Sequence, residues 1–153
     1  MHTLSFSVDI AAPCDAVFHF HDDVENLKQI TPPEADLKIL YADDPGKGQK
    51  VVLSIAQFGF LHMKWEVLIT DYEPPFRMTD EQIKGPFHSW RQTRSFQSLS
   101  NAHTRLTDAV VYELPLQFFS DFFFGALVEQ QITEQFKYRQ AKLKAILENQ
   151  FHS

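Results

Sequence analysis

Residues 87–114 read FHSWRQTRSFQSLSNAHTRLTDAVVYEL, and this stretch decides the fold. Apolar and polar residues alternate on both sides of residues 98–101, whose Ser-Leu-Ser-Asn sequence is typical of a turn. Successive side chains of a strand point to opposite faces of a sheet, so the alternation predicts two strands with one buried face each. The stretch therefore predicts an antiparallel hairpin.

The register of this hairpin predicts which side chains meet. A turn centred on Asn101 places Arg94 opposite Asp108 and Trp90 opposite Tyr112. Side chains opposite each other on paired strands lie about 5 Å apart. We expect the face with the large aromatic residues to point inward. The register therefore predicts a buried or half-buried ion pair between Arg94 and Asp108.

Strand patterns also precede the hairpin. Apolar residues alternate in five further segments, which predict strands over residues 4–10, 37–41, 51–55, 61–69 and 76–83. Phe58-Gly59-Phe60 predicts a tight connection between the third and the fourth of these strands. With the hairpin, the sequence predicts a sheet of about seven strands.

Helical signals occupy two other regions. Pro13 suits the first position of a helix, and the segment from there to Ile30 predicts one or two short helices. Thr31-Pro32-Pro33 ends them, because a residue before proline avoids the helical conformation. From about Phe118, apolar residues recur at spacings near 3.6, which predicts an amphipathic helix of about 25–30 residues. This order predicts an α+β fold, with a curved antiparallel sheet around a long C-terminal helix.

Composition limits the classes of function. The chain has 153 residues, a formal net charge of −6 and 44% hydrophobic residues, which predicts a single globular domain over residues 1–153. The acidic balance argues against a nucleic-acid partner. One cysteine, Cys14, excludes an intrachain disulfide framework. The sequence shows no secretory signal and no membrane-spanning stretch, so we expect a cytoplasmic protein.

Several strings resemble one known family. Gly85-Pro86-Phe87 before Trp90, residues 107–115 (TDAVVYELP) and residues 11–18 (AAPCDAVF) resemble the START-like, or SRPBCC, superfamily. The similar subgroup is the small bacterial "polyketide cyclase/dehydrase and lipid transport-like" proteins, which have the helix-grip fold, also called START or Bet v-like. Histidines commonly follow the tryptophan in that subgroup, at the positions that Gln92 and Arg94 hold here.

The resemblance implies a cavity between the sheet and the C-terminal helix. It also implies a hydrophobic small-molecule ligand, such as a lipid, a polyketide or a quinone, that the protein carries or senses. A minority of such proteins catalyse reactions in the cavity, so a cyclase, dehydratase or hydrolase activity stays open as the alternative. The ligand-binding residues predicted for this chain are Trp65, Met78, Trp90, Gln92, Arg94, Phe96, Asp108, Tyr112, Phe118, Phe122, Ile132 and Phe136.

Strand parity also predicts a polar cluster within the apolar lining, made of Asp80, Gln82, Gln92, Arg94 and Asp108. One interpretation is a polar anchor, with Arg94 holding a ligand carbonyl or carboxylate. The other is a charge pair that fixes strand register without any ligand. The candidates for acid–base chemistry are Asp80, Arg94, Asp108 and Tyr112. The residues favour binding over catalysis, and they indicate no cofactor.

His19-x-His21-Asp22-Asp23 suggests a metal site at first sight. On a helix, His19 and His21 point about 200° apart, so they do not chelate one ion together. His19 and Asp23 share a face, but a zinc site needs more ligands than these two. We therefore predict a solvated helix end and no metal.

Residues 114–125 (LPLQFFSDFFFG) are unusually aromatic. Three interpretations are open: the mouth or lid of a ligand cavity, packing of the helix on the sheet, and an interaction surface. In the last of these, residues 118–124 make the protein an interaction module that contacts a protein partner, a second copy or, transiently, a membrane. We expect a mixture, with Phe118 and Phe122 pointing inward. We expect a monomer or, if this segment forms a contact between two copies, a homodimer.

Overall fold

The computed structural model describes residues 1–57 and 61–152. The predicted connection at 58–60 lies outside the described residues. The strands are β1 (His2–Ile10), β2 (Lys38–Ala42), β3 (Lys50–Gln57), β4 (Leu61–Glu73), β5 (Arg77–Lys84), β6 (Ser89–Ser100) and β7 (His103–Glu113). The helices are α1 (Cys14–Phe20), α2 (Asn26–Gln29) and α3 (Phe122–His152), with 3-10 turns η1 (Pro33–Ala35) and η2 (Leu116–Phe118).

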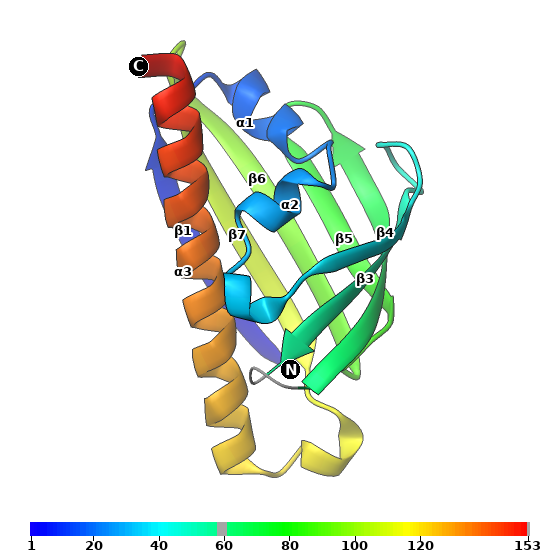
Figure 1. The fold of residues 1–153 in the computed structure, drawn as a ribbon. Helices are drawn as coiled ribbons and strands as arrows, with labels where there is room; N and C mark the ends of the chain where they lie inside the picture. The colour runs from blue at the N-terminus through cyan, green and yellow to red at the C-terminus, as the bar shows by residue number, and fades with distance from the viewer. Residues whose placement is uncertain (58–60, 153) are drawn as a thin grey trace.

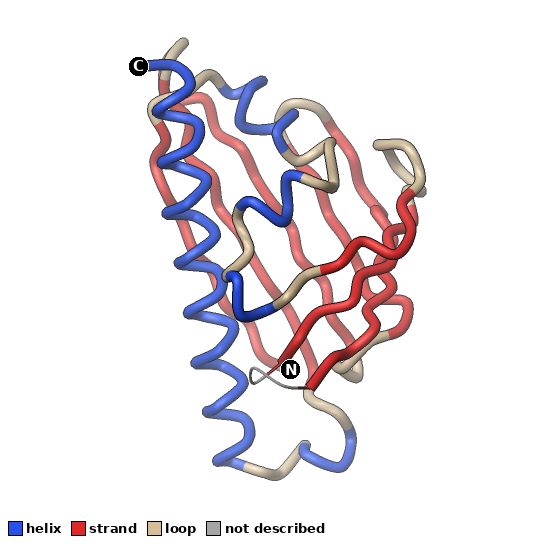
Figure 2. The backbone as a smooth tube through the Cα atoms, in the orientation of Figure 1, coloured by secondary structure: helices blue, strands red, loops and turns tan. Residues whose placement is uncertain are grey.

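All seven strands form one antiparallel sheet in the order β1-β7-β6-β5-β4-β3-β2. The sheet curves, and α3 runs along its open side while α1 and α2 cover one end of the concave face (Figure 1). The tube in Figure 2 shows the same two layers, with one long helix in front of the strands. The predicted α+β helix-grip architecture is confirmed.

The hairpin of β6 and β7 has the predicted register. Arg94 pairs with Asp108 and Trp90 with Tyr112. Along β7, the residues that point to α3 are buried and those between them are half-buried or exposed. Period-two alternation therefore identified the inward face correctly, because only one face of this hairpin is covered.

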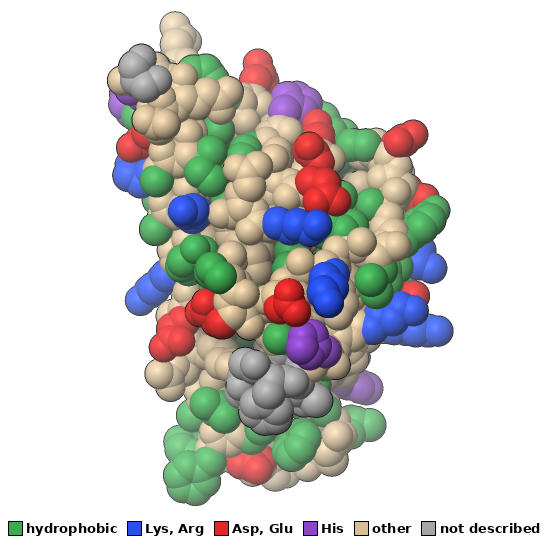
Figure 3. Space-filling view, viewed as in Figure 1, with side chains coloured by type: hydrophobic (Ala, Val, Ile, Leu, Met, Phe, Trp, Pro, Cys, Tyr) green, Lys and Arg blue, Asp and Glu red, His purple; other side chains and the backbone are tan. Residues whose placement is uncertain are grey.

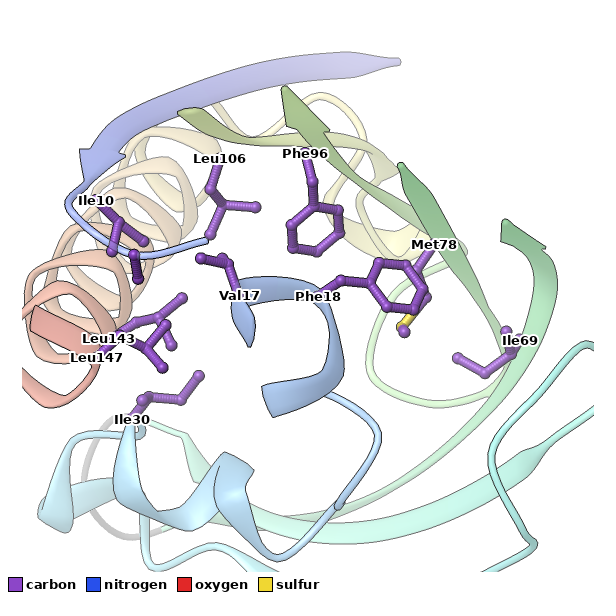
Figure 4. Packing of buried hydrophobic residues seen from close by; sticks show 11 residues of the cluster. Ile10, Val17, Phe18, Ile30, Ile69, Met78, Phe96, Leu106, Leu143 and Leu147 are labelled. Carbon is purple, nitrogen blue, oxygen red and sulfur yellow. The ribbon is translucent and has the colours of Figure 1, made fainter. Parts of the chain in front are cut away.

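The core is best sealed at the end of the molecule that holds α1. Val17 and Phe18 of α1 are fully buried, and they pack between β6, β7 and the last turns of α3, where Leu143 and Leu147 lie (Figure 4). Valine, leucine and phenylalanine side chains thus fill this end of the fold. Toward the opposite end, near η2, a second cluster of buried residues includes Trp90, Leu114, Val128 and Phe136.

Helix α3 begins four residues later than predicted. Residues 116–118 form a 3-10 turn, and the Asp121 side chain then accepts a hydrogen bond from the Phe124 backbone N–H at 2.9 Å. Aspartate is a favoured residue for capping a helix in this way, which explains why the helix starts after it. The buried face of α3 is Val128, Ile132, Phe136, Gln140, Leu143 and Leu147.

Candidate functional site

Within the part of the chain that the structure describes, two chambers lie between the sheet and α3. The inner one has a volume of about 130 Å³ and lies beneath α2, with walls from β3 to β6 and from α3. The outer one has a volume of about 580 Å³ and lies between the β5–β6 turn, η2 and the first half of α3. Trp65, Trp90 and Gln135 line both chambers, so they form the partition between them.

The partition is built from aromatic rings on neighbouring parts of the sheet. The Trp65 and Trp90 rings meet edge to face with centroids 5.0 Å apart, and Phe87 packs against both. The backbone passes close to this cluster at Gly85, where an added Cβ would lie 2.7 Å from Trp65 Cδ1. The Gly85-Pro86-Phe87 string therefore brings the β5–β6 turn against the tryptophan without a side chain in the way.

The polar cluster of the inner chamber differs from the predicted one in its ion pair. Arg94 pairs with Asp80 at 3.1 Å and not with Asp108, so the predicted Arg94–Asp108 pair is wrong. Asp108 instead accepts hydrogen bonds from the side-chain amides of Gln92 (3.3 Å) and Gln140 (2.9 Å). The oxygens of Asp108 on β7 are thus occupied by two amides. Arg94 on β6 instead reaches diagonally to Asp80 on β5, the neighbouring strand on its other side.

Gln82 is also not part of the cluster. Its side-chain amide donates to the Phe87 carbonyl at 2.8 Å and accepts from the Phe87 N–H at 3.3 Å. These two bonds close the β5–β6 turn. The glutamine thus supports the wall of the outer chamber through the backbone.

Two residues of α3 complete the inner cluster, and sequence reasoning missed both. Gln140 bonds the Phe6 carbonyl as well as Asp108, each at 2.9 Å. Arg139 lines the inner chamber, with its guanidinium 4.9 Å from the centroid of the Phe136 ring. The available signal was the position of Gln140 on an otherwise apolar stripe, since a buried amide requires polar partners.

Burial sets the protonation behaviour of this cluster. It raises the pKa of Asp80 above its usual range, although the nearby Arg94 and Arg139 guanidiniums oppose that shift. Burial, followed by repulsion from Arg94, lowers the pKa of Arg139 to about 10. Arg139 is therefore still cationic at neutral pH. The inner chamber combines a fixed positive charge with mostly apolar walls.

His21 lines the inner chamber beside this cluster. Its Nδ1 lies 2.9 Å from the Val17 carbonyl, which can only accept, so Nδ1 carries the proton. Burial, followed by repulsion from Arg94, lowers the His21 pKa from 6.5 to about 3. His21 is therefore a neutral group at physiological pH.

This shift predicts a stability profile. Between pH 6.5 and about pH 3 the unfolded chain binds a proton at His21 that the folded chain does not, so the free energy of unfolding falls as the pH falls. Asparagine keeps a side-chain donor but does not titrate. Between pH 6.5 and pH 5 we therefore expect the free energy of unfolding of His21→Asn to fall by about 1–2 kcal/mol less than that of the unaltered protein. Urea unfolding of both proteins across that range measures it. Parallel profiles would show that His21 takes up its proton equally in both states.

The predicted ligand-binding residues fall into three groups. Those that line a chamber are Trp65, Met78, Trp90, Gln92, Arg94, Phe118, Ile132 and Phe136. Asp108 and Tyr112 are almost fully buried behind the walls, where Tyr112 packs against Phe87 and Trp90. Phe96 belongs to the sealed core next to Phe18, and Phe122 is exposed.

The aromatic segment 114–125 divides between the cavity and the surface. Phe118 stacks on Phe124 at 4.1 Å, and both line the outer chamber. The prediction that Phe122 points inward is wrong, because its side chain is 80% exposed. The helix starts at Phe122, which turns Phe122 and Phe123 outward and Phe124 inward. Hydrophobic side chains gather at this end of the surface (Figure 3).

The described residues bring no three potential metal ligands together. His19 Nδ1 lies 2.6 Å from Asp22 at an exposed site, whereas His21 lines the inner chamber. Among the described helices, none is long and apolar enough to cross a membrane.

Comparison with known proteins identifies the family of this chain. Residues 10–137 match the family model "Polyketide cyclase / dehydrase and lipid transport". No curated protein sequence matches the chain.

Solved structures give the fold. The Zhui aromatase/cyclase from Streptomyces sp. R1128 superposes with a TM-score of 0.79 at 19% identity, covering 99% of this chain and 96% of that one. A START superfamily protein from Mycobacterium smegmatis gives 0.74 at 19% identity, covering 97% and 99%. The protein TTHA0849 from Thermus thermophilus gives 0.72 at 21% identity, covering 94% and 95%.

Proposed function

Because this chain belongs to the polyketide cyclase / dehydrase and lipid transport family, we propose that it binds a bulky hydrophobic small molecule between the sheet and α3. The observation that carries the proposal is the outer chamber. Its volume of about 580 Å³ falls in the range of small-molecule pockets, and its walls are mostly apolar. A lipid, a polyketide or a quinone has the size and polarity for such a space.

The aromatic end of the molecule supports this proposal in a second way. Phe118 and Phe124 line the outer chamber, and Leu116, Phe119 and Phe123 beside them are exposed. An exposed apolar rim next to a chamber is a favourable path for a water-insoluble ligand. We place the entrance here, because the other end is closed by the core around Phe18.

A reaction in the same cavity is the second candidate function. Asp80 favours it, since a buried carboxyl group with a raised pKa on a cavity wall is a candidate for acid–base chemistry. Native mass spectrometry of the protein purified from its host identifies any bound molecule. Incubation with that molecule then separates the functions: an unaltered ligand means carriage or sensing, and a converted one means catalysis.

Filling the outer chamber tests the binding proposal directly. Gln131 lines that chamber and the neighbouring Gln130 is exposed on the same helix. We expect Gln131→Phe to weaken binding of the neutral probe N-phenyl-1-naphthylamine about tenfold, roughly 1.4 kcal/mol, because the ring occupies the probe's space. Energy transfer from the tryptophans reports binding, since both tryptophans of the chain, Trp65 and Trp90, line the chambers.

Gln130→Phe is the matched control, and we expect it to bind the probe like the unaltered protein. Equal binding by both variants would place the probe elsewhere on the surface. A protein that binds no apolar probe at all would contradict the proposed function.

A further inference from the structure

The inner chamber contains polar atoms that lack a partner. In the described part of the chain, the buried side-chain nitrogens without a hydrogen-bond partner are Trp65 Nε1, Arg94 Nε and Arg139 Nε. All three residues line the inner chamber, and all three atoms are donors. Buried donors in native proteins are nearly always paired. The chamber therefore presents three buried donors that have no acceptor among the residues that the structure describes.

The charged residues of the chamber also indicate an acceptor ligand, because one of the two arginines has no carboxylate partner among the described residues. Asp80, the buried carboxylate on the chamber wall, faces Arg94 at 3.1 Å, and Asp108 behind the wall is held by the amides of Gln92 and Gln140. Within residues 1–57 and 61–152, Arg139 makes no ion pair. Arg139 is half-buried and its Nε is fully buried without a partner in the described chain, so an anionic oxygen beside the guanidinium would be favourable.

The remaining walls limit what else such a ligand can carry. Around these donors the inner chamber is lined by apolar side chains, among them Val51, Leu53 and Met78. Trp65 also faces the larger outer chamber. A ligand that fits both chambers has a polar end, which accepts hydrogen bonds at the partition, and a bulky apolar body, which lies in the outer chamber.

We propose that the inner chamber binds the carboxylate of an otherwise apolar or aromatic ligand through Arg139, with Trp65 and Arg94 as further donors. This inference rests on the proposed function and adds the chemical class of the ligand. It also gives the direction of binding, with the carboxylate inward and the apolar body toward η2.

A matched pair of probes tests this assignment. 2-Naphthoate and 2-naphthylmethanol have the same ring system and differ in the carboxylate. We expect the unaltered protein at pH 7.5 to bind the acid about tenfold more tightly than the alcohol. In Arg139→Gln we expect that preference to disappear through weaker binding of the acid, with affinity for the alcohol unchanged. Quenching of the tryptophan fluorescence measures both affinities.

Three further variants keep the test decisive. Lys137→Gln removes an exposed charge on the same helix and should leave the preference intact. Arg139→Lys keeps a cation and should retain part of it. Trp65→Phe removes one donor and leaves Trp90 as the reporter, and it should weaken acid binding more than alcohol binding even if Arg139→Gln does not fold.

The outcomes also separate this inference from the proposed function. Equal affinity for the acid and the alcohol, or an acid preference that survives in Arg139→Gln, overturns the carboxylate site while the apolar cavity stands. Failure of the unaltered protein to bind either probe overturns both.

Discussion

We expect Asp80→Ala to lower the free energy of unfolding by about 3–5 kcal/mol, since removing one partner of a buried ion pair leaves the other charge uncompensated. Asp80 and Arg94 are both nearly buried and lie 3.1 Å apart. Without the carboxyl group, Arg94 would be left with the repulsion from Arg139, a half-buried arginine that lines the same chamber. The alanine also leaves a void, and the apolar side chains around it offer no acceptor that could replace the carboxyl oxygens.

Urea unfolding at pH 7 measures this loss. Asp9→Ala is the matched control, because it removes an aspartate from an exposed ion pair with Arg105, and we expect a much smaller effect. Adding Arg94→Met to Asp80→Ala should recover part of the stability, since no charge is then left unpaired. A loss no larger than that of Asp9→Ala would show that water solvates the chamber well enough to replace the ion pair.

We expect Phe136→Ala to cost about 3–5 kcal/mol of stability as well, which is the usual range for removing a buried aromatic ring. Phe136 is 3% exposed and stacks on Phe6 with centroids 5.3 Å apart. It also supports Arg139, whose guanidinium lies over its ring. The substitution joins a new void to the inner chamber, so it should also weaken the acid preference of the site.

The control for this prediction is Phe123→Ala, on the same helix but 84% exposed. We expect that change to stay within about 0.5 kcal/mol, as surface substitutions usually do. Denaturant unfolding with fitted slopes distinguishes a loss of stability from a change in the unfolded state. A cost below about 1 kcal/mol for Phe136→Ala would mean that the neighbouring rings collapse into the space.

The register of β6 and β7 could be predicted because it depends on residues that lie close together in the sequence. The turn at Asn101 fixes the pairing, and one covered face forces apolar residues to alternate. The same argument placed Trp90 and Gln92 inward correctly. The long helix was also predicted, because the apolar residues Val128, Ile132, Phe136, Leu143 and Leu147 recur at helical spacing, and all five are buried along α3.

The partners of the buried charges were not predictable in this way. Register brings Arg94 opposite Asp108, but each strand of a sheet has two neighbours, and side-chain competition decides between them. Here Gln140 of α3, which lies 32 residues after Asp108 in the chain, donates a hydrogen bond to the aspartate oxygen. The direction of Phe122 was wrongly predicted because the cap at Asp121 makes the helix begin at Phe122, and this start sets the direction of the side chains that follow.

The two ends of α3 are held very differently, and this asymmetry has a kinetic consequence. Leu143 and Leu147 anchor its last turns in the sealed core, whereas Phe122, Phe123 and Leu127 leave its first turns largely exposed. Segments with few buried contacts open locally at a small fraction of the global unfolding cost. Fraying of the first turns would uncover the outer chamber while the rest of the fold stays intact. The residence time of a bound molecule would then depend on the mobility of one helix end, independently of overall stability.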